Sequence, residues 1–118
     1  MIDLLNIVAA VLTIIFGGFG FLAPRYTMGA LHLQTEGNTM GLSEIRASVG
    51  GLFVVTGIAC LFLGTPEAYF MLGIAYVGAS AGRLLSLALD KPPFTKAFVY
   101  FAIEAVLAAW LVAANLPA

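Results

Sequence analysis

Apolar residues in this sequence gather into four long runs that are separated by short polar breaks. The runs cover about residues 4–23, 42–63, 68–89 and 94–116. Each holds roughly 20 residues or more, which as a helix would cross a hydrocarbon layer about 30 Å thick. The runs lack the alternation of transmembrane strands, and backbone groups in lipid need partners within their own segment. We therefore predict an all-α membrane protein, a four-transmembrane-helix bundle forming a single domain over residues 1–118.

Prolines mark the breaks between the runs. Pro24 follows the first run, and the pair Pro92-Pro93 precedes the fourth, as expected because proline ends helices. The sequence Thr65-Pro66-Glu67 is typical of a helix start, with Thr65 as the N-cap. The first run has no basic residues before it and is long for the apolar part of a signal peptide, so we interpret it as a retained helix.

One connection is long and mixed in composition. Residues 24–41 contain charged, polar and apolar side chains. Tyr26, Met28, Leu31 and Leu33 could lie along the membrane surface as a short interfacial helix, and an irregular loop is the alternative. The sequence pattern does not decide between the two.

The composition excludes several classes of protein. Of 118 residues, 62% are apolar and 9% charged, whereas a soluble domain has about 45–50% and about 25%. The net charge of −1 argues against nucleic acid as a partner. Cys60 is the single cysteine, so an intrachain disulfide and a multi-cysteine metal site are excluded. We expect no cofactor and no metal.

The basic residues indicate an orientation. All five lie on or nearest the side that holds the long connection and the turn between the third and fourth runs: Arg25, Arg46, Arg83, Lys91 and Lys96. Lys and Arg near the ends of spans favour the cytoplasmic side. We therefore predict a multi-pass protein of the bacterial inner membrane, with the long connection in the cytoplasm and both termini in the periplasm.

Small residues predict close helix packing. Gly50, Gly57 and Gly64 recur every seven residues in the second run, and Gly78 and Gly82 form a GxxxG pair in the third. Such stripes allow two helix backbones to approach each other. Packing within one bundle is the first interpretation, and a seam between two copies of the chain is the alternative.

Charged residues inside the apolar runs are the most informative feature. Glu44, Arg46, Arg83 and Glu104 come from three runs, and a rise of about 1.5 Å per residue places all four in the cytoplasmic half. Ionisable groups in lipid usually face the bundle interior and pair. We expect a buried Arg/Glu cluster in which Glu104 pairs with Arg83 or Arg46 and Glu44 takes the remaining arginine.

The cluster supports three hypotheses about function. In the first, the protein binds a membrane lipid or a small amphipathic or anionic ligand, with a role related to transport. In the second, it is a structural or accessory subunit whose charges only fix helix packing and which contacts a second copy or another membrane protein. An enzyme is the third and weakest, because the sequence has no evident nucleophile or phosphate loop. The predicted ligand-binding residues are Glu44, Arg46, Tyr76, Ser80, Arg83, Tyr100 and Glu104.

The same residues resemble a known family. The stretch from Leu42 to Gly51 is similar to the E-x-R-A-x-x-G-G signature of small bacterial inner-membrane proteins grouped as a domain of unknown function. The architecture is similar, more loosely, to that of DoxX-like four-helix proteins. The resemblance implies a four-helix membrane bundle and no established activity. Its signature positions would be Glu44, Arg46, Gly50, Gly51, Arg83 and Glu104.

Overall fold

The computed structural model describes residues 2–34 and 36–116, and these residues form helices and turns without a strand. Four helical stretches in this part of the chain are long and apolar enough to cross a membrane: Asp3–Leu22, Met40–Leu63, Pro66–Leu89 and Phe94–Ala114. Their bounds lie within about two residues of the predicted runs. Large apolar side chains are exposed along them, including Phe62 at 87% and Leu22 at 77%. The predicted all-α fold class is confirmed, and these helices indicate a multi-pass membrane protein.

The chain divides into two compact units, close to residues 3–62 and 63–118. The N-terminal unit begins with α1 (Ile2–Leu22), which is followed by the short helix α2 (Pro24–Ala30). A continuous helical stretch then runs through α3 (Met40–Glu44), η1 (Ile45–Gly51) and α4 (Leu52–Leu63). The long connection is therefore partly helical.

Part of the first half of the second predicted span is a π-helix, which the sequence pattern did not predict. In η1 the backbone is wound more widely, so that the Leu52 N–H donates to the carbonyl of Ala47, five residues earlier. Most of the E-x-R-A-x-x-G-G stretch lies in this element. π-Helical turns are rare and occur frequently at functional sites.

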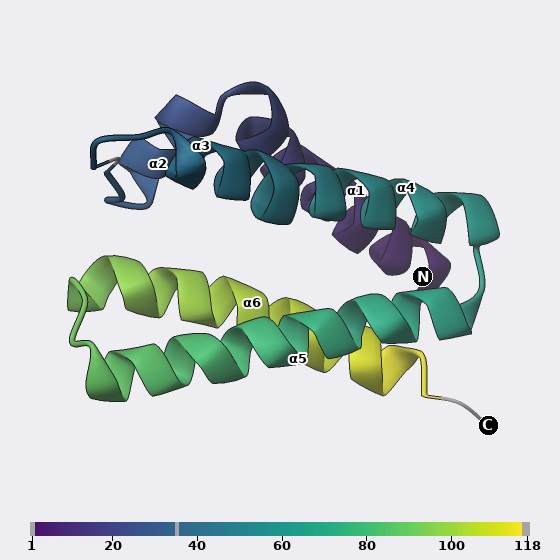
Figure 1. Ribbon diagram of the computed structural model, residues 1–118. Coiled ribbons are helices and arrows are strands. Elements are labelled where there is room, and N and C mark those ends of the chain that lie inside the picture. Colours follow the sequence, from purple (N-terminus) through teal and green to yellow (C-terminus); the bar gives the residue numbers. More distant parts are fainter. Residues whose placement is uncertain (1, 35, 117–118) are drawn as a thin grey trace. The chain divides into compact units, whose positions relative to one another are not determined.

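Glycines bring α1 against η1 and α4, which cross it in Figure 1. A Cβ atom added to Gly50 would lie 2.5 Å from the backbone nitrogen of Phe21, and one on Gly57 would lie 3.0 Å from the carbonyl oxygen of Ala10. The predicted packing role of these two glycines is therefore confirmed. Gly64 lies beyond the end of α4 with φ 61°, where a glycine ends a helix without steric cost.

The C-terminal unit is a hairpin of two helices that lie side by side in Figure 1. The first, α5 (Pro66–Leu89), has the predicted N-cap, because the Thr65 hydroxyl accepts a hydrogen bond of 3.3 Å from the Ala68 N–H. The second, α6 (Phe94–Ala114), follows a tight turn at Lys91. The helices approach closely at Gly73, where an added Cβ would lie 2.8 Å from that of Leu111.

The GxxxG pair on α5 does not serve this approach. An added Cβ at Gly78 or Gly82 would meet no atom within 4 Å. The close approach of α5 to α6 within the hairpin therefore occurs at Gly73 and not at the GxxxG motif.

Candidate functional site: an arginine–glutamate pair on the α5–α6 hairpin

Arg83 of α5 and Glu104 of α6 form a two-point ion pair. Arg83 Nε lies 3.2 Å from Glu104 Oε1, and Arg83 Nη2 lies 3.3 Å from Glu104 Oε2. This is the forked geometry that a planar guanidinium offers a carboxylate. One of the two partners predicted for Glu104 is therefore confirmed, and the pair joins the two helices of the hairpin.

Tyr100 adds an aromatic contact to this pair. It lies one turn before Glu104 on α6, and its ring centroid is 5.5 Å from the guanidinium carbon of Arg83. The negative face of an aromatic ring attracts a cation at this separation. Arg83 thus lies between a carboxylate and a π system, both supplied by α6.

The expected burial of the charged groups is wrong. In the part of the chain that the structure describes, every charged residue keeps some exposure, and the side chains of Arg83 and Glu104 are 33% and 19% exposed. The buried polar residues are uncharged: Asn6, Thr13, Thr27 and Asn115. Removing a charge fully from polar surroundings costs several kcal/mol, whereas a long side chain can bury its stem and keep its head accessible.

Two polar residues precede Arg83 on α5 at helical spacing. Tyr76 is 4% exposed, and Ser80 is partly buried. The Ser80 hydroxyl oxygen is shielded from solvent and has no hydrogen-bond partner among the described residues. A shielded hydroxyl without a partner is costly, so Ser80 is a place where a ligand or a water molecule would gain a hydrogen bond.

Arg46 has a different role from the one predicted. Its Nη1 donates a hydrogen bond of 2.5 Å to the carbonyl oxygen of Phe21, in the last turn of α1. Carbonyls at the end of a helix lack intrahelical partners, so a guanidinium there supplies one. Arg46 therefore links the π-helix η1 to the end of the first long helix.

The expected pair between Glu44 and Arg46 is absent from the described residues, where Arg83–Glu104 is the one ion pair. Glu44 instead accepts a hydrogen bond of 3.4 Å from the hydroxyl of Ser48, one turn later. Residues two apart on a helix do not face each other, which explains why Glu44 cannot reach Arg46. Both side chains are exposed, and both belong to the N-terminal unit.

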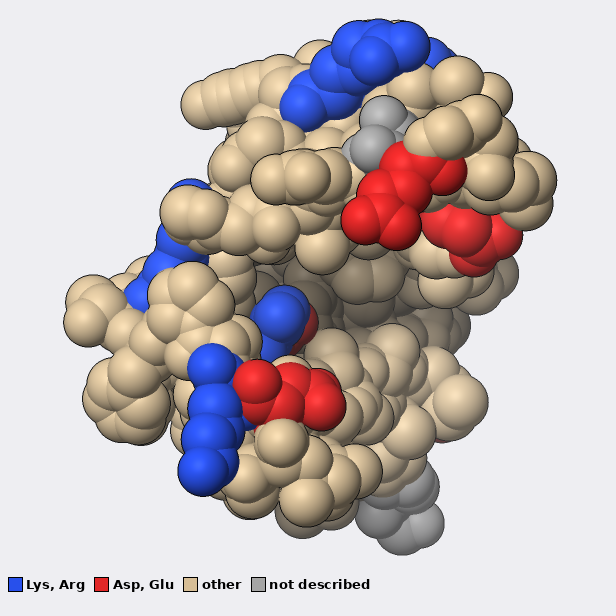
Figure 2. Space-filling view, turned by 60° about the vertical axis from the view of Figure 1, so that its left-hand side comes forward, with Lys and Arg blue, Asp and Glu red and all other residues tan. Residues whose placement is uncertain are grey.

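Figure 2 shows several blue and red groups on one face of the molecule, set among uncharged residues. No group of three or more His, Cys, Asp or Glu residues that could hold a metal ion occurs within the described residues. The contacts that Arg83 and Glu104 make are ionic and hydrogen-bonding.

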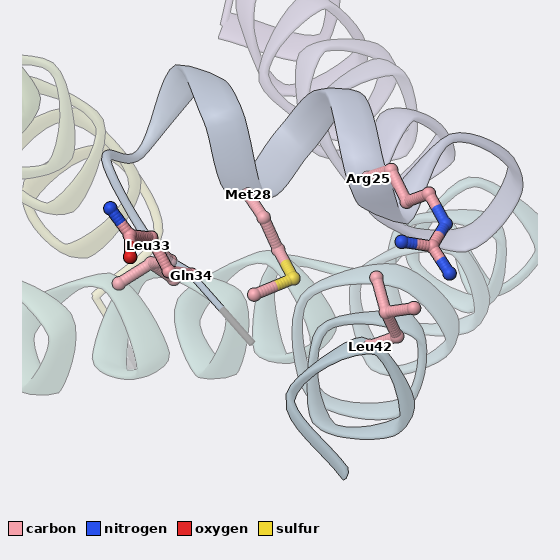
Figure 3. Close-up of a pocket in the computed structure, with 5 residues that line it drawn as sticks. All are labelled: Arg25, Met28, Leu33, Gln34 and Leu42. Atoms are coloured by element: carbon pink, nitrogen blue, oxygen red, sulfur yellow. The ribbon is translucent and has the colours of Figure 1, made fainter. Parts of the chain in front are cut away.

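Sequence reasoning missed a pocket in the N-terminal unit. Its volume is about 280 Å³, and its lining residues come from α2, the following connection and α3: Arg25, Met28, Leu33, Gln34 and Leu42. In Figure 3, Arg25 and Leu42 lie on one side of Met28, with Leu33 and Gln34 on the other. The available signal was an arginine beside apolar residues just beyond the end of a span.

Comparison with protein families gives a match that spans all of the helices described above. The profile of a domain of unknown function, DUF4345, matches residues 2–115. The chain belongs to the DUF4345 family. Comparisons of this DUF4345 protein with curated proteins and with solved structures found no match. The match covers every residue of the ion pair and of the pocket, and it supplies no activity.

Proposed function

We propose that this DUF4345 protein binds a lipid or a small amphipathic anionic molecule in the membrane, with Arg83 as the group that recognises the anion. One observation carries the proposal. Glu104 engages Nε and Nη2 of Arg83, and the remaining nitrogen, Nη1, has no hydrogen-bond partner among the described residues. An arginine whose side chain is 33% exposed and whose guanidinium keeps a free donor can bind a carboxylate or a phosphate.

The neighbouring side chains fit an amphipathic ligand. The Ser80 hydroxyl, one turn before Arg83 on α5, has no partner among the described residues but is shielded, so a ligand would reach it only after neighbouring side chains moved. The Tyr100 ring offers an apolar face with a polar end. Glu104 would orient the guanidinium and limit the affinity for anions by neutralising part of its charge. Tyr76, Glu44 and Arg46 complete the predicted ligand-binding set, and their contribution is part of the proposal.

The predicted place of the protein in the cell belongs to the same proposal. All five basic residues lie toward one side of the predicted topology, which supports a bacterial inner membrane with periplasmic termini. In this orientation, Arg83 would meet ligands from the cytoplasmic leaflet. A role related to transport would follow if the bound molecule moved toward the opposite side.

A titration with a fluorescent fatty acid, cis-parinaric acid, tests ligand binding in detergent-solubilised protein. Arg83→Gln is expected to weaken binding about tenfold or more, because a hydrogen bond to a charged group is lost. Lys91→Gln is the matched control, since it removes one basic residue of the same hairpin that has no part in the ion pair. Equal binding by the Arg83 variant and the unmodified protein, with both folded by circular dichroism, would overturn the proposal.

A structural or accessory subunit is the second candidate, and the direct contact between Arg83 and Glu104 favours it. A forked pair that joins two adjacent helices would fix their register without any ligand. The open glycines Gly78 and Gly82 would then face a second copy or another membrane protein. Glu104→Gln separates the two candidates. A ligand site predicts tighter anion binding, because the arginine is released. A structural role predicts a less stable hairpin without any gain in binding.

A further inference from the structure

The pocket of the N-terminal unit combines one cation with an apolar wall. Arg25 is the charged residue of its lining, Gln34 adds an amide, and the others are apolar. Arg25 is exposed and takes part in no ion pair or hydrogen bond of the described residues. Arg46, the other arginine of this unit, is already engaged with the Phe21 carbonyl. Arg25 is therefore a cation without a counter-ion beside a cavity.

The apolar part of the lining comes from Met28, Leu33 and Leu42. Met28 is 6% exposed and extends from α2 into the space between the two sides of the pocket (Figure 3), while Leu42 projects from α3. A thioether side chain adapts its shape to hydrocarbon groups. The wall thus suits a glycerol backbone or the first carbons of an acyl chain, next to a group that suits an anion.

The predicted spans put the pocket at the level of the phospholipid head groups. Arg25 follows the end of α1 at Leu22 by three residues, across the break at Ala23, just before α2 begins. Leu42 belongs to the first turns of the second long helical stretch, Met40–Leu63. The lining therefore comes from segments at the ends of two predicted spans, at the level of the interface and not of the hydrocarbon.

We propose that this pocket binds the phosphate of an anionic phospholipid from the surrounding leaflet. Arg25 would bind the phosphate oxygens, Gln34 a head-group hydroxyl, and Met28 and Leu42 the adjoining hydrocarbon. A volume of about 280 Å³ accommodates a head group and leaves the acyl chains outside. The site shares no residue with the Arg83–Glu104 pair, so it stands independently of the proposed function.

Native mass spectrometry of detergent-purified protein tests this inference. The protein is incubated with equal amounts of phosphatidylglycerol or phosphatidylcholine, and the retained lipid is counted. The unmodified protein is expected to retain more phosphatidylglycerol, and Arg25→Gln to lower that retention about fivefold, the loss typical of one interfacial basic residue. Arg25→Lys should preserve part of it, and Lys91→Gln, which removes a basic residue outside the pocket, should preserve all of it.

Competition separates a membrane lipid from a free phosphate. An excess of glycerol 3-phosphate should leave the retained phosphatidylglycerol unchanged, because the apolar wall contributes only to the lipid. Displacement by this competitor would overturn a lipid site. Equal retention of both lipids, or unchanged retention by a folded Arg25→Gln variant, would overturn the phosphate contact. Because cis-parinaric acid and Arg83 variants test the hairpin, either site can fail without the other.

Discussion

The guanidinium of Arg46 donates a hydrogen bond to the carbonyl oxygen of Phe21, so that a charged residue of the π-helix holds the end of the first long helix. A Cβ added to Gly50, one turn later in η1, would lie 2.5 Å from the backbone nitrogen of the same residue, so the two backbones pass close together. The two contacts together fix where η1 crosses α1. Arg46, a candidate ligand-binding residue in the sequence, is therefore also a structural link within the N-terminal unit.

Arg46→Gln is expected to lower stability, because the Phe21 carbonyl loses a charged donor at a helix end. The expected loss is about 1 kcal/mol. Thermal unfolding in dodecyl maltoside, followed by circular dichroism, measures it as a lower Tm. Lys91→Gln removes a basic residue that belongs to neither proposed binding site and should leave Tm unchanged. Equal Tm values for the two variants would contradict the role of the Phe21 contact.

Gly50→Ala is expected to destabilise the protein more strongly. Its Cβ would lie 2.5 Å from the backbone nitrogen of Phe21, and backbone cannot move aside as a flexible side chain can. Overpacking of this kind costs about 1–3 kcal/mol. Gly18→Ala on α1 is the control, since its Cβ would meet nothing within 4 Å and alanine favours a helix. A Gly50 variant as stable as the Gly18 variant would show that α1 and η1 are not closely packed.

The glycines of α5 provide a matched pair for the hairpin. Gly73→Ala should lower Tm, because its Cβ would lie 2.8 Å from that of Leu111 on α6. Gly78→Ala meets no such obstacle and should leave Tm unchanged or raise it. If Gly78→Ala instead abolished a dimer seen by cross-linking, the GxxxG pair would be assigned to contact between copies.

Glu104→Gln tests what the ion pair does. The amide cannot balance the charge of Arg83, so the hairpin should lose about 1–2 kcal/mol, between the values for exposed and buried pairs. A ligand site predicts tighter binding of cis-parinaric acid at the same time, because the guanidinium is released. Lower stability without any gain in fatty-acid binding would favour the structural candidate.

The proposed orientation is tested by reporter fusions at the C-terminus, after Ala118. Alkaline phosphatase should be active there and green fluorescent protein dark, since both termini are expected in the periplasm. A reporter inserted in residues 24–41 should show the opposite behaviour. A fluorescent C-terminal fusion would reverse the proposed orientation and would place Arg83 toward the periplasmic leaflet.

The long helices and one ion pair could be predicted from the sequence because their signals are local or scarce. Apolar runs and prolines set the helix bounds, and Thr65 has the side chain that an N-cap requires. Arg83 and Glu104 could be matched because few charged residues lie inside the spans and each is costly there alone. The predicted positions of Arg83 and Glu104 along their helices also put the two side chains in the same half of the membrane.

Other features depend on geometry that the sequence pattern does not contain. The seven-residue π-helix η1 lies inside an apolar run. Its residue types do not distinguish it from an α-helix, so the sequence pattern could not predict it. Glu44 and Arg46 were expected to form an ion pair, but they are two residues apart, which directs their side chains to different faces of the helix. The pocket at Arg25 depends on how α2 folds back toward Leu42, which no spacing rule gives.

The wide winding of η1 affects how this chain can change over evolution. A π-helical turn contains about one residue more than an α-helical turn, because its hydrogen bonds span five residues and not four. Deleting one residue from Ile45–Gly51 would therefore allow a regular α-helix in which the segments on either side keep nearly the same rotation. A chain that is one residue shorter in this stretch should still fold, with Arg46 or Gly50 displaced from Phe21 according to which residue is removed.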